Sequence, residues 1–465
     1  MPIIIPANSA VGGGFDVANS LRFNSGSSDY LNRTFGTPTS SQTWTLSFWI
    51  KRCKIGSATE FVFNTDGGNE EDRLQFSSSD TLTWFEQNSG GGTVAELTTS
   101  QKFRDVSAWY HIVVARDSTQ GTSSNRIKLY VNGSQVTALG TATYPSQNDS
   151  SRWNTAVAHE IGARNGGTFV NLYMSEVVFI DGQQLAPTSF GEFDEDSGIW
   201  KPIDVSGLTF GNNGFYLDFE DSSSLGNDSA GSNNWTVNNF TAIDQSTDTC
   251  TNNFATMNFL SGSFSNNTLT EGNLLITVTS GWRWKPSTIA PSSGKWYAEF
   301  KPTSGGNIYT VPGAVPQVSW DSIDGETIGT GAGGENKSVG YSYDGNVIKG
   351  NSTVYSGSSY TTNDIIGVAM DLDNFKIYFS KNGTFQNSGN PASGATGTGA
   401  VSLDSSLTDW SLSPSAAGSA MACNYGSAPY AISSGNADGN GFGNFEYAVP
   451  SGYFALCSKN LAEYG

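Results

Sequence analysis

Short segments in which apolar and polar residues alternate recur along this chain, and turn dipeptides separate them. Residues 43–50 read TWTLSFWI, and residues 109–116 read WYHIVVAR. Residues 126–133 read RIKLYVNG and end in Asn-Gly, a strong short hairpin signal. A period of two residues places every second side chain on the same face of a strand, and no stretch has an apolar period of 3.6 residues. The pattern predicts an all-β protein with negligible helix.

The composition also favours strands. Charged residues make up 14% of the 465 residues, against roughly 25% in an average globular protein, and aromatic residues make up 12%. Such a chain folds through aromatic and β-branched strands joined by turn residues. In residues 43–50, we expect one face to carry Trp44, Leu46 and Phe48, and the other face to carry Trp49 and Ile50.

The formal charge is −19. An acidic surface repels the phosphates of nucleic acids and of anionic lipids, so we expect no nucleic-acid partner and no docking on a membrane. No run approaches the roughly 20 apolar residues that span a bilayer, so no membrane insertion is expected. The four cysteines have no metal-binding spacing and are interpreted as reduced core residues: Cys53, Cys250, Cys423 and Cys457.

Residues 1–18 are expected to form an extended docking arm. Their two prolines favour extended backbone, and three consecutive glycines provide a flexible joint. Ile3, Ile4 and Ile5 form an apolar patch that needs burial, so we expect it to pack against another chain. The stretch lacks the basic region of a signal peptide, which predicts synthesis in a cytoplasm.

Five stretches of the first half share the strand order of one known family. They are LRFNSGSSDYL (21–31), TWTLSFWIKR (43–52), AWYHIVVARD (108–117), IKLYVNGSQV (127–136) and HEIGARNGGTFVNLYMSEVVFIDGQQL (159–185). In this order they resemble the laminin-G and concanavalin A-like family, and YLDFEDSSSLGNDSAG (216–231) looks like a further strand and loop of it. The resemblance implies a jelly-roll-type antiparallel sandwich over residues 19–262, including a junction.

The second half carries a different strand pattern. SGKWYAEF (293–300), VGYSYDG (339–345) and IIGVAMDLDNFKIYFSKNGTF (365–385) are its clearest segments. They resemble the SPRY domain, which implies a second jelly-roll-type sandwich over residues 263–465, with a C-terminal tail.

The junction FGEFDEDSGIWKP (190–202), the tail YAVPSGYFALCSKNLAEYG (447–465) and the pairing of the two domains resemble phage proteins, especially those of marine and cyanobacterial phages. Such proteins are assigned to tail fibres or other virion appendages. The resemblance implies a structural protein on the virion surface, either a tail fibre or a head or capsid decoration, with a role in attachment to a host protein or glycan. It also implies that the arm docks onto other virion proteins and that the chain forms a homo-oligomer, with a trimer favoured.

Catalytic motifs are incomplete. Some concanavalin A-type sandwiches are glycoside hydrolases with Glu-x-Asp-x-x-Glu on one strand, and retention requires two carboxyl groups about 5–5.5 Å apart. The nearest sequence here is Glu192-Phe-Asp194-Glu-Asp196, which lacks the final glutamate and is interpreted as an acidic turn. The two histidines, His111 and His159, are interpreted as core or edge residues. No catalytic residue is predicted.

A calcium site remains open in the loop after residues 214–220. Members of the laminin-G family often hold calcium, and Asp218, Asp221 and Asp228 offer the hard oxygen ligands it requires. No EF-hand spacing is present, and no cofactor is required by the predicted function.

Sugar binding would use aromatic side chains as stacking platforms. The candidates in the second half are Trp282, Trp284, Trp320, Tyr341 and Tyr343. The sequence therefore favours a virion structural and adhesion protein. Two alternatives remain: a polysaccharide-active enzyme of the concanavalin A class, which lacks its carboxylate motif, and a free SPRY-type protein-binding module, which leaves the arm and the first half unexplained.

Overall fold

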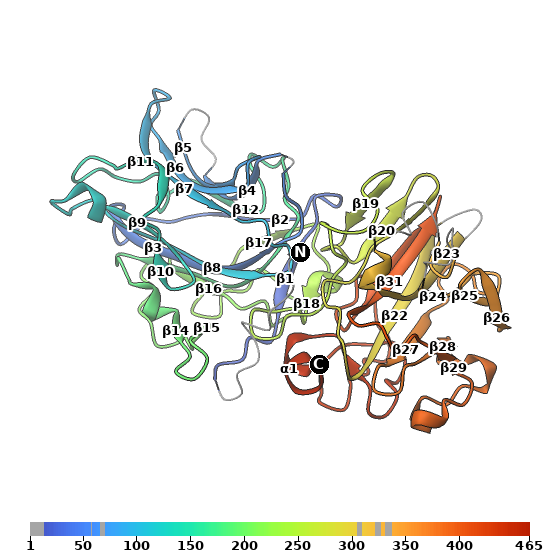
Figure 1. Cartoon of the computed structure of the whole chain (residues 1–465). Helices are drawn as coiled ribbons and strands as arrows, with labels where there is room; N and C mark the ends of the chain where they lie inside the picture. The colour runs from blue at the N-terminus through green and yellow to red at the C-terminus, as the bar shows by residue number, and fades with distance from the viewer. Residues whose placement is uncertain (1–13, 57, 66–69, 305–308, 321–326, 331–336) are drawn as a thin grey trace. The chain divides into compact units, whose positions relative to one another are not determined.

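The computed structural model of the chain describes residues 14–465 apart from 57, 66–69, 305–308, 321–326 and 331–336. It consists mainly of antiparallel strands, which confirms the all-β prediction (Figure 1). In the described part of the chain, the α-helix is α1 (Ser458–Tyr464), next to the C-terminus, and no helix is long and apolar enough to cross a membrane. Ile3, Ile4 and Ile5 of the predicted arm lie outside the described residues.

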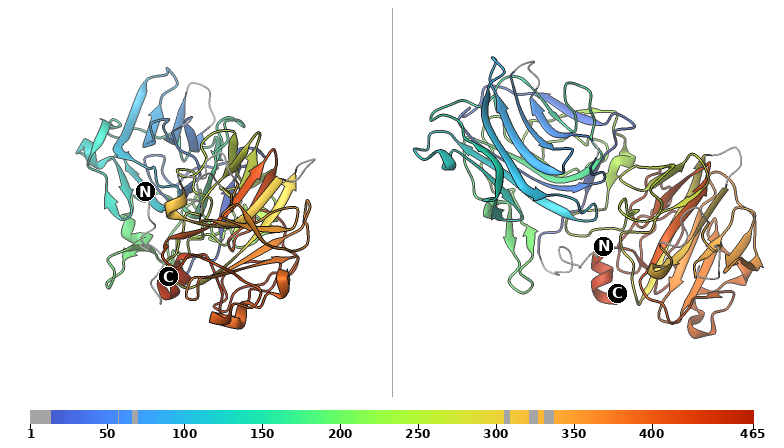
Figure 2. Two further views of the ribbon diagram at one scale, coloured as in Figure 1. Left: turned by 45° about the vertical axis from the view of Figure 1, so that its right-hand side comes forward. Right: turned by 45° about the horizontal axis from the view of Figure 1, so that its top comes forward.

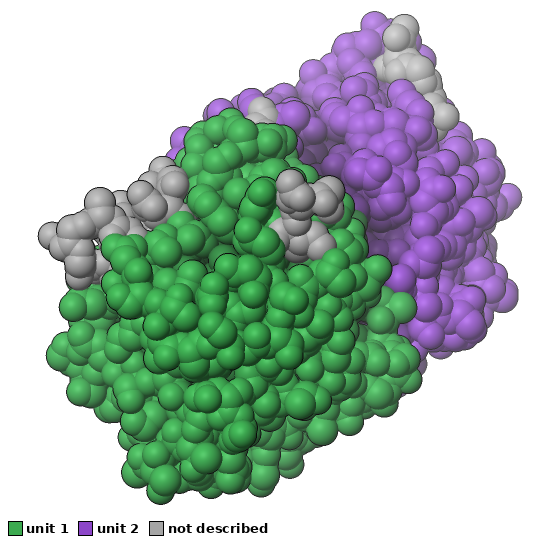
Figure 3. Space-filling view, turned by 90° about the vertical axis from the view of Figure 1, so that its right-hand side faces the viewer, with its two compact units in different colours: residues 1–10, 252–465 green, residues 11–251 purple. Residues whose placement is uncertain are grey.

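The described chain forms two compact units that divide between Thr251 and Asn252 (Figure 3). The boundary predicted from the sequence is residue 262. The structure places it earlier because the intervening backbone bonds within the second unit. The Ala255 N–H, for example, donates to the carbonyl of Leu456 over 2.9 Å.

The first unit contains two facing sheets, whose long strands are visible in Figure 2. One sheet has the order β10 (Ser134–Gln135), β9 (Ile127–Val131), β8 (Trp109–Asp117), β3 (Thr43–Arg52), β13 (Leu172–Asp181), β1 (Ser20–Phe23) and β18 (Gln245–Ser246), and β16 (Phe215–Leu217) also pairs with β13. The other has the order β11 (Leu139–Thr143), β7 (Thr93–Lys102), β6 (Thr81–Gln87), β5 (Glu71–Phe76), β4 (Glu60–Thr65), β12 (Ala158–Ile161), β2 (Tyr30–Thr34) and β17 (Thr236–Asn238). A separate hairpin joins β14 (Gly191–Phe193) to β15 (Trp200–Pro202).

Alternation along β3 supplies much of the core between these sheets. Trp44, Leu46, Phe48 and Ile50 all belong to the inter-sheet cluster, whereas Trp49 packs in a separate cluster. The expectation that Ile50 faces the same way as Trp49 is therefore wrong, because a period of two returns residue 50 to the face of residues 44, 46 and 48.

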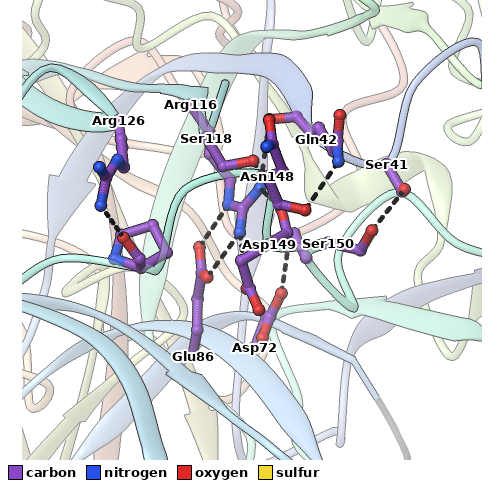
Figure 4. Close-up of polar contacts among 12 residues, drawn as sticks. Ser41, Gln42, Asp72, Glu86, Arg116, Ser118, Arg126, Asn148, Asp149 and Ser150 are labelled. Atoms are coloured by element: carbon purple, nitrogen blue, oxygen red, sulfur yellow. Dashed lines mark hydrogen bonds and ion pairs between the residues drawn. The ribbon is translucent and has the colours of Figure 1, made fainter. Parts of the chain in front are cut away.

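A buried ion cluster links the two sheets of the first unit (Figure 4). Arg116 on β8 reaches Glu86 on β6, with its Nε 2.9 Å from one carboxylate oxygen and its Nη2 3.2 Å from the other. Asp72 lies opposite Glu86 in the β5–β6 register, and Arg116 also pairs with Asp149 over 3.2 Å. Arg116, Glu86 and Asp72 are all buried, so the guanidinium is the cation that compensates the carboxylate of Glu86, while burial and the charge of Glu86 raise the pKa of Asp72 to about 7.

The second unit also contains two facing sheets. One has the order β19 (Asn267–Thr270), β20 (Leu275–Val278), β32 (Ala420–Asn424), β22 (Lys295–Ser304), β27 (Ile366–Asp371), β28 (Lys376–Lys381) and β29 (Thr384–Phe385); β30 (Val401–Ser402) pairs with β28, and β33 (Phe454–Ala455) pairs with β22 in parallel. The other has the order β21 (Trp282–Trp284), β31 (Trp410–Ala417), β23 (Tyr309–Pro316), β24 (Val339–Tyr341), β25 (Asn346–Lys349) and β26 (Ser352–Ser356). Side chains of both sheets, including Trp296, Val368 and Leu412, share one core cluster.

Candidate functional site

Three aromatic side chains meet at one end of the sheet that contains β21, β31 and β23. Strand pairing places Trp282 of β21 and Tyr309 of β23 opposite the same residue, Ala417 of the strand between them. The backbones of the two outer strands are separated by about 9.5 Å, twice the usual spacing, yet the ring centroids are 6.4 Å apart. The rings approach because the small side chain of Ala417 leaves room above it.

Tyr309 also contacts Tyr343, which follows β24. Their ring centroids are 5.1 Å apart and their planes meet at 89°, an edge-to-face geometry favoured by aromatic quadrupoles. The Tyr309 side chain is 38% exposed, and Trp282 and Tyr343 are half-buried. We call these three residues the aromatic strip. It presents partly hydrated rings from three separate segments of the second unit.

A hollow of about 630 Å³ lies at the opposite end of β23 and β31. The loop after β23 and the loop before β31 supply most of its wall. The lining residues are Ser261, Gln317, Val318, Trp320, Ser406, Leu407, Thr408 and Asp409. Trp320, one of the sugar-binding candidates of the sequence, thus lies beside both aliphatic and polar side chains.

Hydrogen bonds fix the polar side of this hollow. The Gln317 N–H donates to the carbonyl of Asp409 over 3.1 Å, which joins the two loops. The Asp409 carboxylate accepts from the hydroxyl of Ser292 over 2.9 Å and from that of Thr408 over 3.0 Å. Asp409 has a φ of 56°, a left-handed conformation that is uncommon for a non-glycine residue. These bonds hold the carboxylate at the wall of the hollow.

Two of the predicted aromatic platforms are buried, which corrects the prediction for them. Trp284 has no exposed surface and belongs to a small cluster against which Trp282 and Trp320 pack. Tyr341 lies in the inter-sheet core, and its hydroxyl donates to the carbonyl of Ser358. A ring without exposed surface cannot stack on a sugar, so only Trp282, Trp320 and Tyr343 of the five remain candidates.

The structure does not bring Asp218, Asp221 and Asp228 together as a metal site. Asp228 accepts backbone N–H bonds, including that of Tyr216 at 2.9 Å; Asp221 accepts from the backbone N–H of Ser223 at 2.9 Å. Each of the three carboxylates instead stabilises its own part of the loop. Among the described residues, no group of three or more acidic, histidine or cysteine side chains could hold a metal ion. This corrects the expectation of a calcium site built by these three aspartates.

The acidic sequence of the junction forms the turn of the β14–β15 hairpin, in agreement with its interpretation as a turn. Glu192 and Asp194 both pair with Lys201, at 3.3 Å and 3.2 Å. Asp194 also accepts the backbone N–H bonds of Asp196 and Ser197, at 3.2 Å and 2.9 Å. The hydrogen bonds from Ser197 lower the pKa of Asp194 to about 2. Asp194 is thus an ionised turn-stabilising group, which does not suit a general acid.

Both histidines are core residues, as predicted. His111 Nδ1 accepts a hydrogen bond from Trp200 Nε1 over 2.9 Å, and its Nε2 lies 2.9 Å from the hydroxyl of Ser47. His159 stacks on Phe35 with ring centroids 3.6 Å apart. Burial lowers the pKa of each histidine to about 3, so both are neutral near neutral pH.

Sequence reasoning missed Tyr309 and most of the hollow. Tyr309 joins the strip only because β21 and β23 flank the same strand, β31, which lies about 100 residues further along the chain. Gln317 and Asp409 meet for the same reason. Neither contact can be predicted from the local sequence pattern. The only feature that could have drawn attention to Tyr309 is that it begins a strand-like segment.

The two units define an all-β protein built of antiparallel sandwiches. Within the first, residues 25–184 match the laminin-G model of the concanavalin A-like lectin/glucanases superfamily. This match confirms the predicted resemblance of the first segment over those residues. No curated protein matches the chain.

Several solved structures are similar to parts of the chain. The SPRY domain of human HERC1 is 18% identical, with a TM-score of 0.26, over 32% of this chain and 87% of that domain. A putative carbohydrate binding protein from Bacteroides ovatus is 16% identical, with a TM-score of 0.33, over 48% of this chain and 59% of that one. A heptameric SAP-like pentraxin from Limulus polyphemus is 16% identical, with a TM-score of 0.28, over 37% and 80%. At these TM-scores the similarities carry no argument about function.

Proposed function

We propose that this protein is a non-catalytic adhesion protein of a phage virion surface, and that it binds a host-surface glycan on the aromatic strip. The observation that carries the proposal is the strip itself. Trp282, Tyr309 and Tyr343 converge from three segments at the end of a rigid sheet, and their rings remain partly exposed.

Partly exposed aromatic rings suit a sugar because each pyranose has one face of C–H groups and a rim of hydroxyl groups. The C–H face packs on a ring, while the tyrosine hydroxyls and the indole N–H supply polar contacts at the edge. Trp282 and Tyr309 stand on paired strands, and the N–H of Tyr343 donates to the carbonyl of Thr310 over 3.2 Å, so little conformational entropy is lost when a ligand binds. The match of the first unit to a lectin and glucanase superfamily is a second reason to consider a carbohydrate.

The carboxylates of the first unit support a non-catalytic role. Glu192 and Asp194 share Lys201 in a hairpin turn. Asp72 and Glu86 oppose each other across β5 and β6 but are buried against Arg116. Glycoside hydrolysis requires a carboxyl pair that reaches both the sugar and a water molecule, and neither of these pairs provides one.

The virion assignment rests on the resemblance of the junction and the tail to phage appendage proteins. The predicted arm of residues 1–18 is too long at its end, because Val17 is buried in a cluster of the first unit and its N–H donates to the hydroxyl of Thr251 over 3.0 Å. Under this proposal the part of the arm around Ile3, Ile4 and Ile5 docks onto other virion proteins. The chain forms a homo-oligomer with three copies favoured, and it is displayed after synthesis in the host cytoplasm. Mass spectrometry of purified virions tests this part. A protein present at a fixed copy number per particle is expected, and its absence from particles made by cells that express it would overturn the assignment.

Binding is tested with the full chain on an array of bacterial-surface oligosaccharides. Trp282→Ala and Tyr309→Ala are each expected to reduce binding at least tenfold. Phe193→Ala is the matched control, because Phe193 is also an exposed aromatic residue, at 52%, but lies in the first unit. Equal binding by all three variants, with unchanged melting temperatures, would show that the strip is not the glycan site.

A further inference from the structure

The hollow beside Trp320 is separate from the aromatic strip. Tyr309 and Pro316 are the two ends of β23, and seven steps along a strand span roughly 23 Å. The strip lies at the first end, and the hollow lies beyond the second, where Gln317 and Trp320 line it. A ligand unit held in one cannot touch the other.

We propose that this hollow is a second sugar-binding pocket, which takes a single neutral or positively charged pyranose and rejects anionic sugars. That the ligand is a sugar rests on the proposed adhesion function; the location and the charge preference rest on the hollow itself.

The lining matches the two-sided chemistry of a pyranose. Trp320, Val318 and Leu407 form an apolar part of the wall, and the hydroxyl, amide and carboxylate groups of Thr408, Gln317 and the remaining lining residues form the polar part. A volume of about 630 Å³ falls within the usual range of small-molecule sites. Val318, at the wall, is 67% exposed. Such a large exposed aliphatic side chain gains burial when a ligand covers it.

The charge of the lining gives the preference. Asp409 is acidic, and no lysine or arginine is among the described residues that line the hollow. The Asp409 carboxylate accepts one hydrogen bond from each of two hydroxyl groups, those of Ser292 and Thr408. A carboxylate has about four acceptor positions, so it can also accept from a sugar hydroxyl or an ammonium group. A carboxylate or phosphate on the sugar would meet the like charge of Asp409 at this wall.

The wall is fixed before any ligand binds. The buried Trp410 follows Asp409; its indole N–H donates to the carbonyl of Leu407 over 3.2 Å, and its backbone N–H donates to the carbonyl of Pro291 over 3.0 Å. On the opposite side, the Trp320 N–H donates to the carbonyl of Gln317 over 3.0 Å. The loop before β31 is therefore anchored to the sandwich, and the loop after β23 is joined to it by the bond from Gln317 to Asp409 and by the packing of Trp320 on a buried cluster. A fixed site loses less entropy on binding.

The test uses the full chain and three matched probes: the methyl glycosides of glucose, glucosamine and glucuronic acid. Binding is measured by ligand-observed NMR titration. The wild type is expected to bind the glucoside and the glucosaminide at least tenfold more tightly than the glucuronide. Trp320→Ala is expected to lose at least tenfold in affinity for the first two, whereas Phe193→Ala, which lies outside both the hollow and the strip, is expected to retain it.

Asp409→Asn tests the charge preference, because a change in the selectivity between charged sugars would not result from a loss of packing. The wild type is expected to bind the glucosaminide more tightly than the glucuronide. Removal of the Asp409 charge is expected to reduce this affinity ratio at least threefold, and the affinity for the uncharged glucoside is expected to change least. Melting temperatures within 2–4 °C of the wild type, roughly 1 kcal/mol for a domain of this size, show that each variant is folded.

Failure of the wild type to bind any of the three probes would overturn the pocket but leave the strip untouched. Equal binding of glucuronide and glucoside would overturn the charge preference, and loss of monosaccharide binding in Trp282→Ala alone would assign the sugar to the strip.

Discussion

Glu176 interrupts β13 where the register with β3 shifts, between Ser175 and Val178. Its φ of 51° is left-handed, its carboxyl group is buried, and Oε2 accepts a hydrogen bond from the hydroxyl of Tyr216 over 2.7 Å. Burial raises the pKa of Glu176 to about 8, with a smaller contribution from nearby carboxylates such as Asp218, and the hydrogen bond from Tyr216 only partly opposes this. The folded protein therefore keeps a proton that the unfolded chain loses near pH 4.5.

This pKa shift predicts the direction of a pH dependence. Between about pH 4.5 and 8 the folded state binds more protons at Glu176 than the unfolded state does, so the contribution of this residue to stability is largest below pH 4.5 and decreases as the pH rises through that window. Glu176→Gln cannot ionise and should not show this decrease. From pH 5 to pH 8, the unfolding free energy of the variant should rise relative to that of the wild type by at least about 1.4 kcal/mol, the value of one pKa unit. Thermal melts across this range check the prediction, and parallel curves for the two proteins would contradict it.

Individual residues also show where sequence reasoning stops. Trp282 and Trp284 lie two positions apart on one strand, so alternation assigns them to the same face. Their exposure differs because Val311 and Ile328, which are distant in sequence, join Trp284 in a small cluster. The local sequence pattern identified Trp282 and Trp284 as aromatic strand residues. Residues distant in the sequence bury Trp284, so only Trp282 can contact a ligand.

At the scale of single strands, the sequence pattern predicted several of the long strands of both units, including β3, β8, β27 and β28, but it did not pick out others such as β6, β7, β23 and β31. It did not predict which strands are neighbours. Only the order β21-β31-β23 brings Trp282 and Tyr309 together over Ala417 and joins Gln317 to Asp409. Strand pairing depends on which apolar faces fit together in three dimensions, and a period of two residues carries no information about that choice.

The contact between β8 and the facing strands predicts a large effect of one substitution. Arg116→Met removes the cation that faces Glu86 and Asp72. The pKa of Asp72 is raised by its burial and by the charge of Glu86. Breaking a buried ion pair by removal of one partner costs about 3–5 kcal/mol, and the loss should appear in denaturant unfolding of the full chain. The triple variant Arg116→Met, Glu86→Gln, Asp72→Asn is the control, because it removes the fully buried charges of the cluster together and leaves only the partly exposed Asp149 without its cation. It should recover at least about 1 kcal/mol; a triple variant no more stable than Arg116→Met would contradict the electrostatic explanation.

At the scale of the whole molecule, the boundary between the units can be tested with two fragments. Residues 252–262 are predicted from the sequence to belong to the junction at the end of the first domain. In the structure it belongs to the second unit. Phe254 forms an isolated β-bridge with Cys457, and the Met257 N–H donates to the carbonyl of Asn273 over 2.9 Å. The backbone of Thr256 exchanges hydrogen bonds with Thr288, at 3.0 Å and 2.7 Å.

The fragment 252–465 should therefore fold more stably than the fragment 263–465. The shorter fragment lacks Phe254 and Met257, which are almost completely buried in two clusters of the second unit, and it leaves the carbonyls of Asn273 and Leu456 without these donors. Full burial of each such side chain contributes about 1.5–3 kcal/mol, so the difference in unfolding free energy should be about 3–6 kcal/mol. Denaturant unfolding of the two fragments, at equal protein concentration, measures it. Phe254→Ala in the longer fragment separates the contribution of side-chain burial from that of the backbone hydrogen bonds. This variant keeps the backbone hydrogen bonds, so it should lose only part of the difference in unfolding free energy. If the two fragments unfold at the same denaturant concentration, residues 252–262 are a linker and the boundary lies at residue 262 after all.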